Sequence, residues 1–147
     1  MRTTSSSGGF TLLELILVVS VLGLLTALAI PAYASFRRNV ALTNYADEIV
    51  SALRTAQNRS STSQGGVVHG VHLTTNQYCL FTGSTFSTCT SPSYQLHGDI
   101  TITSGTGDAI FSRFTGAPAA PATIVLQVTG GPSKTITIDI SGRISVF

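Results

Sequence analysis

One long run of apolar residues near the amino terminus constrains this chain more than any other feature. From Phe10 to Ala34 the sequence has 25 residues, and Glu14 is the only formally charged side chain among them. At ~1.5 Å per residue, a helix of that length covers roughly 37 Å, which is more than the ~30 Å hydrocarbon core of a bilayer. We therefore predict a helix that spans a membrane over residues 10–35.

Glu14 is the exception within this run. A carboxylate inside a membrane costs about 2.5–3.5 kcal/mol on insertion scales, so such a side chain is usually neutralised, paired or functional. A carboxylate and an ammonium group that meet there relieve each other's desolvation cost. The sequence therefore predicts a partner for Glu14.

The residues around Glu14 resemble the amino terminus of type IV prepilins and of type II secretion pseudopilins. Residues 1–9 form a short polar leader that ends in Gly9, Phe10 follows, and Glu14 is the fifth residue after that glycine. The resemblance implies that a prepilin peptidase cuts between Gly9 and Phe10 and that the new amine of Phe10 is methylated. It also implies a filament with packed helices, in which Glu14 meets the Phe10 ammonium of a neighbouring subunit.

The same resemblance implies the partners and the location of the protein. The partners would be other pilin or pseudopilin subunits, the prepilin peptidase, an assembly platform in the inner membrane and the lipid bilayer. The protein would cross the cytoplasmic membrane once, with its head outside the cytoplasm, before it joins a filament. The basic residues do not support this orientation, because Arg2 precedes the span while Arg37 and Arg38 follow it.

An ordinary secretory signal is the alternative interpretation of the apolar run. Residues 32–34, Ala-Tyr-Ala, have the small-x-small form of a signal peptidase site, which would release a β-rich domain after Ala34. The apolar run exceeds the ~7–15 residues of a signal peptide, and a glutamate stands near its start. We favour the prepilin interpretation and keep the released domain as an alternative.

Gly23 and Pro31 interrupt the apolar helix. A proline inside a helix removes a backbone donor and clashes with the preceding turn, so we predict a kink or a locally unwound section between these two residues. The alternative is that Pro31 ends the helix at the membrane surface. We favour continuation, because an apolar stripe at steps of three or four follows. The stripe consists of Leu42, Tyr45, Ile49, Leu53 and Ala56.

Residues 36–62 are therefore predicted to be the amphipathic half of the helix, lying on a β-rich head of residues 63–147. The helix ends in the polar run 58–66, after Gln57. The predicted strands are 67–73, 77–81, 94–97, 99–103, 109–114, 123–128, 134–140 and 143–147. The predicted fold class is α+β, a pilin fold, with the long amino-terminal helix packed on an antiparallel β-sheet or a two-layered β head.

Alternation is clearest in the segment 134–140. Ile136, Ile138 and Ile140 share one face there. Ser141 and Gly142 follow, and this pair predicts a two-residue hairpin before the last strand.

The carboxyl-terminal part resembles the heads of FimT/GspH-type minor pilins and pseudopilins. The resemblance rests on residues 111–114, Phe-Ser-Arg-Phe, on the glycine-rich loop that follows, and on a close in Ile-Ser-Gly-Arg-Ile. Some members of that group contribute to DNA uptake through arginines near the terminus, with Gly-Arg followed by a second Arg. Here Gly142 and Arg143 match, whereas Ser145 stands at the place of the second arginine.

Nucleic acid is therefore an alternative partner rather than the expected one. The formal net charge of +2 is too small to indicate a polyelectrolyte partner. The cations that a DNA contact would use are Arg143, Arg113 and Lys134, and no aromatic run separates them.

Cys79 and Cys89 are the only cysteines in the sequence. An even count in a chain that crosses a membrane favours one disulfide, with two free buried thiols as the alternative. Two cysteines cannot complete a structural zinc site, and His69 and His72, three apart on a predicted strand, point to opposite faces. We expect no metal and no cofactor.

The sequence contains no nucleophile elbow, phosphate-binding loop or dinucleotide fingerprint, so we do not expect an enzyme. The function that the sequence predicts is structural: a minor pilin or pseudopilin of a type IV pilus or a type II secretion pseudopilus. A DNA-binding minor pilin of a DNA-uptake pilus is the second hypothesis.

Overall fold

The structure, a computed structural model, describes residues 9–147, and the predicted leader apart from Gly9 lies outside the described residues. Helix α1 runs without a break from Leu12 to Ser61, a length of 50 residues. It includes position 31, so the predicted continuation of the helix past the proline is confirmed. The kink between Gly23 and Pro31 stays a prediction.

The chain divides into two compact units, one that ends at Arg37 and one from Arg38 to Phe147. The second unit is the head, and it includes the last part of α1. One face of that part enters the core, where Leu42, Ile49 and Leu53 have at most 2% of their surface exposed. The predicted apolar stripe is therefore confirmed.

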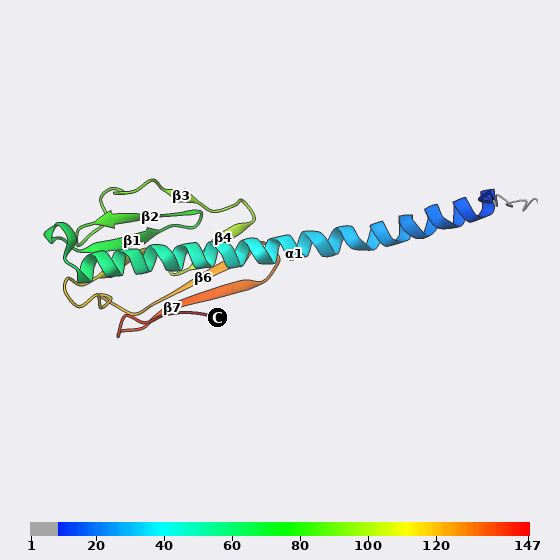
Figure 1. Cartoon of the computed structure of the whole chain (residues 1–147). Coiled ribbons are helices and arrows are strands. Elements are labelled where there is room, and N and C mark those ends of the chain that lie inside the picture. Colours follow the sequence, from blue (N-terminus) through cyan, green and yellow to red (C-terminus); the bar gives the residue numbers. More distant parts are fainter. Residues whose placement is uncertain (1–8) are drawn as a thin grey trace, which may run out of the picture. The chain divides into compact units, whose positions relative to one another are not determined.

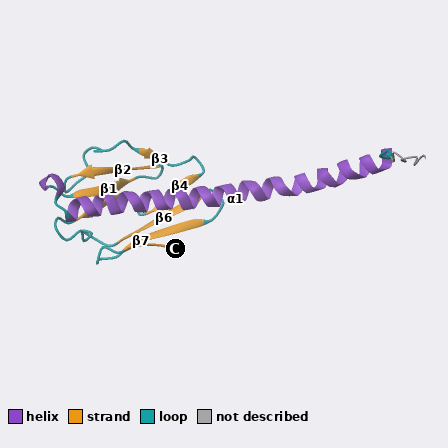
Figure 2. Ribbon diagram, in the orientation of Figure 1, coloured by secondary structure: helices purple, strands orange, loops and turns teal. Residues whose placement is uncertain are grey.

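Within residues 9–147 the head forms two antiparallel four-stranded sheets, which Figures 1 and 2 show around α1. Sheet A contains, in spatial order, β3 (Tyr94–Gln95), β2 (Gln77–Thr82), β1 (His69–Leu73) and β5 (Gly107–Phe111). Sheet B contains β4 (Ile100–Ser104), β6 (Ala122–Val128), β7 (Ser133–Ile138) and β8 (Ile144–Val146). A short 3-10 helix, η1 (Gln64–Gly66), lies between α1 and β1.

Both sheets and α1 contribute to one hydrophobic core. Val71 and Phe111 enter it from sheet A, Ile124 and Ile136 enter it from sheet B, and all four are fully buried. In Figure 1 β1 and β2 are drawn on one side of α1 and β6 and β7 on the other. The predicted α+β fold is therefore confirmed, in the form with a two-sheet head.

The end of α1 lies further along the chain than Gln57. The helix includes the first four residues of the polar run, because Ser60 is fully buried and bonded to the start of β1. The Ser60 hydroxyl accepts a hydrogen bond from the His69 N–H at 2.8 Å and donates one to the His69 carbonyl at 3.3 Å. A polar residue that finds partners in the core extends the helix despite its low intrinsic propensity.

The last hairpin differs from the predicted two-residue turn. The Asp139 N–H donates to the Arg143 carbonyl at 2.9 Å, and the Gly142 N–H donates to the Asp139 carbonyl at 2.8 Å, so residues 140–142 form a three-residue loop. Gly142 has a φ of +82°, the left-handed conformation that such loops require. Strand β7 ends at Ile138, and Ile140 is 71% exposed in the loop rather than on the buried face.

Candidate assembly helix and head surface

The amino-terminal end of α1 is capped by a threonine that sequence reasoning missed. The Glu14 N–H donates to the Thr11 hydroxyl at 3.2 Å, and the Leu15 N–H donates to the Thr11 carbonyl at 3.1 Å. The signal for this cap is in the sequence, because Thr11 and Glu14 have the spacing of a capping box. The negative charge of Glu14 in the first turn also interacts favourably with the positive end of the helix dipole.

The first part of α1 presents its apolar side chains to the surroundings. The large apolar side chains described between Phe10 and Phe36 have from 42% (Val18) to 80% (Phe10) of their surface exposed. Within residues 9–147, α1 is the one helix that is long and apolar enough to cross a membrane. An apolar surface of this size needs a cover of lipid or of other apolar protein.

The hydroxyl groups inside this apolar segment are satisfied within the helix itself. The Ser20 hydroxyl donates to the Ile16 carbonyl at 2.7 Å, and the Thr26 hydroxyl donates to the carbonyls of Leu22 and Gly23 at 3.0 and 2.9 Å. Such bonds remove the cost of placing a hydroxyl in an apolar medium. Glu14 is left as the one charged side chain of the segment.

The other end of α1 is tied to two loops of the head by Gln57. Its amide nitrogen donates to the Gly116 carbonyl at 3.0 Å and to the Gly142 carbonyl at 2.8 Å. The Phe114 N–H donates to the Ser60 carbonyl one turn further along. No sequence pattern identifies this glutamine, because its partners are 59 and 85 residues away along the chain.

The three candidate DNA-binding cations do not form one cluster. Arg113 and Arg143 lie on the loops that Gln57 holds, and both side chains are exposed. The Arg113 guanidinium donates to the Ser63 hydroxyl at 3.0 and 2.8 Å. Lys134 lies at the opposite end of β7 from Arg143, because the ladder pairs Ile136 with Val146 and Ile138 with Ile144.

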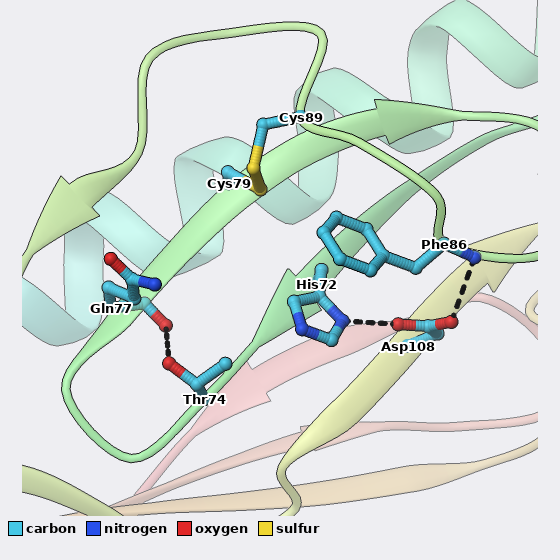
Figure 3. A network of polar contacts seen from close by, with 7 residues as sticks. All are labelled: His72, Thr74, Gln77, Cys79, Phe86, Cys89 and Asp108. Carbon is cyan, nitrogen blue, oxygen red and sulfur yellow. Dashed lines mark hydrogen bonds and ion pairs between the residues drawn. A yellow bond between two sulfur atoms is a disulfide. The ribbon is translucent and has the colours of Figure 1, made fainter.

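A disulfide and an aromatic pair hold a loop over the outer face of sheet A, as Figure 3 shows. Cys79 and Cys89, which are ten positions apart in the sequence, are bonded and close a ring. Phe86 in that ring stacks on the His72 ring, with 3.7 Å between the ring centroids. Beneath the loop Phe81 is fully buried although it lies on the face opposite the main core. The disulfide loop therefore covers a second, smaller apolar cluster.

A polar contact between His72 and Asp108 fixes the same loop. The His72 Nδ1 lies 2.5 Å from the Asp108 Oδ1, and the other carboxylate oxygen of Asp108 accepts the Phe86 N–H at 3.2 Å. His69 lies on the opposite face of β1, where it is buried and its Nε2 lies 3.0 Å from the Gln64 carbonyl. The predicted opposite orientation of the two histidines is confirmed.

A second pair of polar groups, which the sequence did not reveal, joins β2 to α1. The buried Tyr78 hydroxyl donates to the Glu48 carboxylate over 3.5 Å. Burial raises the pKa of Tyr78, and the negative charge of Glu48 raises it further. Tyr94 stacks on Tyr78 with 5.2 Å between centroids.

Comparison with known proteins finds partial relatives. Over 48 residues, which are 33% of this chain and 30% of the relative, it is 48% identical to a fimbrial protein of Pseudomonas aeruginosa. Over 59 residues, 40% of each chain, it is 39% identical to the prepilin peptidase-dependent protein D of Escherichia coli (strain K12). The chain thus spans less than half the length of the curated relatives it matches. No family model and no solved structure match it.

These relatives support a pilin-like family for the chain. The long apolar helix and the two-sheet head agree with that assignment.

Proposed function

We propose that this chain is a structural subunit of a type IV pilus or of a type II secretion pseudopilus, in the role of a minor pilin or pseudopilin. The observation that carries the proposal is the first part of α1, whose apolar side chains are exposed and whose hydroxyls are bonded internally. Such a helix is suited first to lipid and then to packing against the same helix of other copies. The names of the partial relatives support this role.

The proposal gives Gly9, Phe10 and Glu14 definite tasks. A prepilin peptidase cuts between Gly9 and Phe10, and the new Phe10 amine is methylated. That amine then pairs with the Glu14 carboxylate of a neighbouring copy, where each charge reduces the other's desolvation cost. The exposure of both side chains in the structure supports this assignment, since Phe10 directly before α1 and Glu14 in its first turn are exposed.

The subunit waits in the cytoplasmic membrane before assembly. The span of residues 10–35 anchors it there, with the head outside the cytoplasm, and an assembly platform in the inner membrane moves it into the filament. We assign it no catalytic role, no metal and no cofactor.

Amino-terminal sequencing of the membrane-extracted protein, together with filament recovery, tests the proposal. The full chain is expressed in cells that carry a type IV pilus or type II secretion machine, and surface material is sheared off and separated from the membrane pool. We expect a chain that starts at Phe10 in both fractions. A chain that starts at Ser35 would support the released β-rich domain and would contradict the filament role.

A DNA-binding minor pilin is the second candidate. Gln57 favours it, because it anchors the two loops that carry Arg113 and Arg143 at one end of the head. Gel shifts of the detergent-extracted full chain over a salt series test it, with Lys134→Ala as a control of equal charge away from these loops. If the chain binds DNA through phosphate contacts, its affinity should fall as the salt concentration rises. DNA binding that Arg143→Ala leaves unchanged would remove this candidate.

A further inference from the structure

Two grooves flank the outer face of α1 in the head. Groove A lies on the side of β2 and β3, and its lining includes Glu48, Ser51, Thr55, Arg59, Tyr78 and Tyr94. Groove B lies on the side of β8, and its lining includes Asp47, Ser51, Arg54, Thr55, Asn58 and Val146. Because Ser51 and Thr55 line both grooves, they form the ridge between them.

Each groove has an acid toward the start of α1 and a base toward its end. Glu48 and Arg59 of groove A are separated by 11 positions, or ~16.5 Å along the helix axis. Asp47 and Arg54 of groove B are separated by seven positions, or ~10.5 Å. Within residues 9–147, no ion pair shorter than 4.0 Å involves any of the four. These charges are therefore available to a partner outside the chain.

Groove A has the chemistry of a site for a guanidinium group. The Tyr78 hydroxyl holds the Glu48 carboxylate at the wall of the groove. The stacked ring of Tyr94 is 46% exposed, so it offers an aromatic face beside that carboxylate. A carboxylate binds a guanidinium through two parallel hydrogen bonds, and an aromatic face adds a cation–π contact. With a volume of about 380 Å³ the groove has room for such a group.

We propose that groove A receives the Arg54 guanidinium of a second copy of this chain. Arg59 already lines groove A of its own copy and is half-buried, whereas Arg54 is exposed beside groove B. The groove B side of one copy therefore packs on the groove A side of the next. This inference rests on the proposed filament function, in the form of a filament or pseudopilus in which copies of this chain are neighbours and are inserted in one direction.

Parallel copies can make this contact only with an offset along the helix axis. Without an offset, Asp47 on the groove B side of one copy comes level with Glu48 on the groove A side of the next to within one position, so the two acids repel. An offset of six residues brings Arg54 level with Glu48 and corresponds to ~9 Å. The order of charges along α1 therefore favours staggered neighbours over neighbours in register.

The contact joins two different faces of the molecule. Contacts of this heterologous kind repeat from copy to copy, and they form a helical filament when the rotation between copies does not close a ring. An isologous dimer of parallel copies has its two-fold axis along the helices and allows no axial offset, so an isologous form of this contact would require antiparallel copies. Antiparallel copies cannot both insert their apolar segments from the same side of one membrane.

Two charge reversals in separate full-length chains test the contact. Glu48→Arg places a cation in groove A, and Arg54→Glu places an acid on the donor side. Each variant alone is expected to lower the ratio of sheared filament to membrane pool about five- to tenfold. Co-expression of the two chains is expected to restore the ratio to near wild type. When the two chains alternate in a filament, the groove A that carries Glu48→Arg faces the donor side that carries Arg54→Glu. At the next contact, an unchanged Glu48 faces an unchanged Arg54.

Three further variants are controls. Lys134→Glu makes the same change in net charge as Arg54→Glu outside both grooves, so it should neither lower the ratio nor rescue Glu48→Arg. Glu48→Gln keeps an acceptor for Tyr78 and should still reduce assembly, which separates lost pairing from misfolding. Arg59→Glu tests the identity of the donor, and rescue of Glu48→Arg by this chain instead of Arg54→Glu would overturn the assignment of Arg54.

The outcomes separate this contact from the function on which it rests. If wild type assembles and both single reversals assemble equally well, the contact is wrong and the filament function stands. If the mixed chains assemble as poorly as each variant alone, no contact between copies joins these residues. If wild type is processed to Phe10 and still never enters a filament, the filament function fails and the contact fails with it.

Discussion

At the scale of single residues, Glu14 has two possible roles: a local one in the first turn of its own helix and an intermolecular one in pairing with a neighbouring copy. If it pairs with the Phe10 amine of a neighbour, Glu14→Leu leaves that amine uncompensated, at a cost of about 3–5 kcal/mol. We expect processed monomers that accumulate in the membrane and a loss of sheared filaments, measured by mass spectrometry and by filament recovery. Wild-type levels of assembled subunit would refute the pairing.

Thr11 supplies the matched control for that substitution. Its hydroxyl caps the helix through the Glu14 N–H, so Thr11→Ala removes the local contact and keeps the carboxylate. The loss of such a cap costs about 1 kcal/mol of helix stability. A variant that assembles normally would show that the effect of Glu14→Leu does not arise from fraying of the first turn.

Because of Tyr78, the free energy of unfolding of the head should vary with pH in the alkaline range. Burial and Glu48 raise the pKa of Tyr78, so the folded head keeps a phenol proton that the unfolded chain releases near pH ~10. The stabilisation that this residue contributes is therefore complete below pH ~10 and declines as the pH rises further. In urea unfolding, Tyr78→Phe should be less stable than wild type by about 1 kcal/mol at pH 8, with a gap that shrinks above pH 10. A gap independent of pH would contradict this account.

At the scale of elements, the disulfide loop should behave as a separate stabilising unit. A bridge that closes ten residues contributes about 2–3 kcal/mol in the chain-entropy model, and its reduction also loosens the cover over Phe81. We expect reduction to lower the melting temperature of the detergent-extracted protein by roughly 10 °C. The double variant Cys79→Ala, Cys89→Ala should not respond to a reductant. Labelling of both thiols in native exported protein would show that no bridge forms.

The elements themselves were largely predictable, and their pairing was not. Each of the eight strands described in the head overlaps a predicted strand, although some bounds differ: residues 109–114 were predicted where β5 is Gly107–Phe111. Alternation was clearest in the segment that contains Ile136 and Ile138. It also placed Ile140 on the buried face, where a loop fixed by the Asp139 carboxylate exposes it instead. Alternation shows which face a residue takes and does not show which strand lies beside it, so the sequence left one sheet or two layers open and could not predict the strand order of either sheet.

Some residues of the candidate sites can be identified from the sequence, and others only from the folded structure. Glu14 stands out in the sequence because a charge in an apolar run is costly wherever it occurs, and Phe10 stands out because it follows the glycine that ends the polar leader. Gln57 and the pair of Glu48 with Tyr78 depend on contacts between residues 30 to 85 positions apart. No local pattern encodes such contacts, so only the folded chain reveals them.

At the scale of the whole molecule, the head should fold without the apolar segment. The buried core residues begin at Leu42. Deletion of residues 1–35 should therefore give a soluble domain with a single cooperative melting transition, within a few degrees of the full chain in detergent. Circular dichroism at increasing temperature measures this. A deletion variant that aggregates or melts without a transition would show that the first part of α1 contributes to the stability of the head.

The hydrogen bond between Gln57 and Gly142 can form only late in synthesis, after both residues have been made. The two residues are 85 positions apart, so at synthesis rates of about 5–20 residues per second the glutamine waits roughly 4–17 s for its partner. Throughout that interval sheet B is incomplete, because β7 and β8 are the last strands to emerge. The nascent head is therefore most prone to aggregate just before its final residues appear, and whatever shields it must act until then.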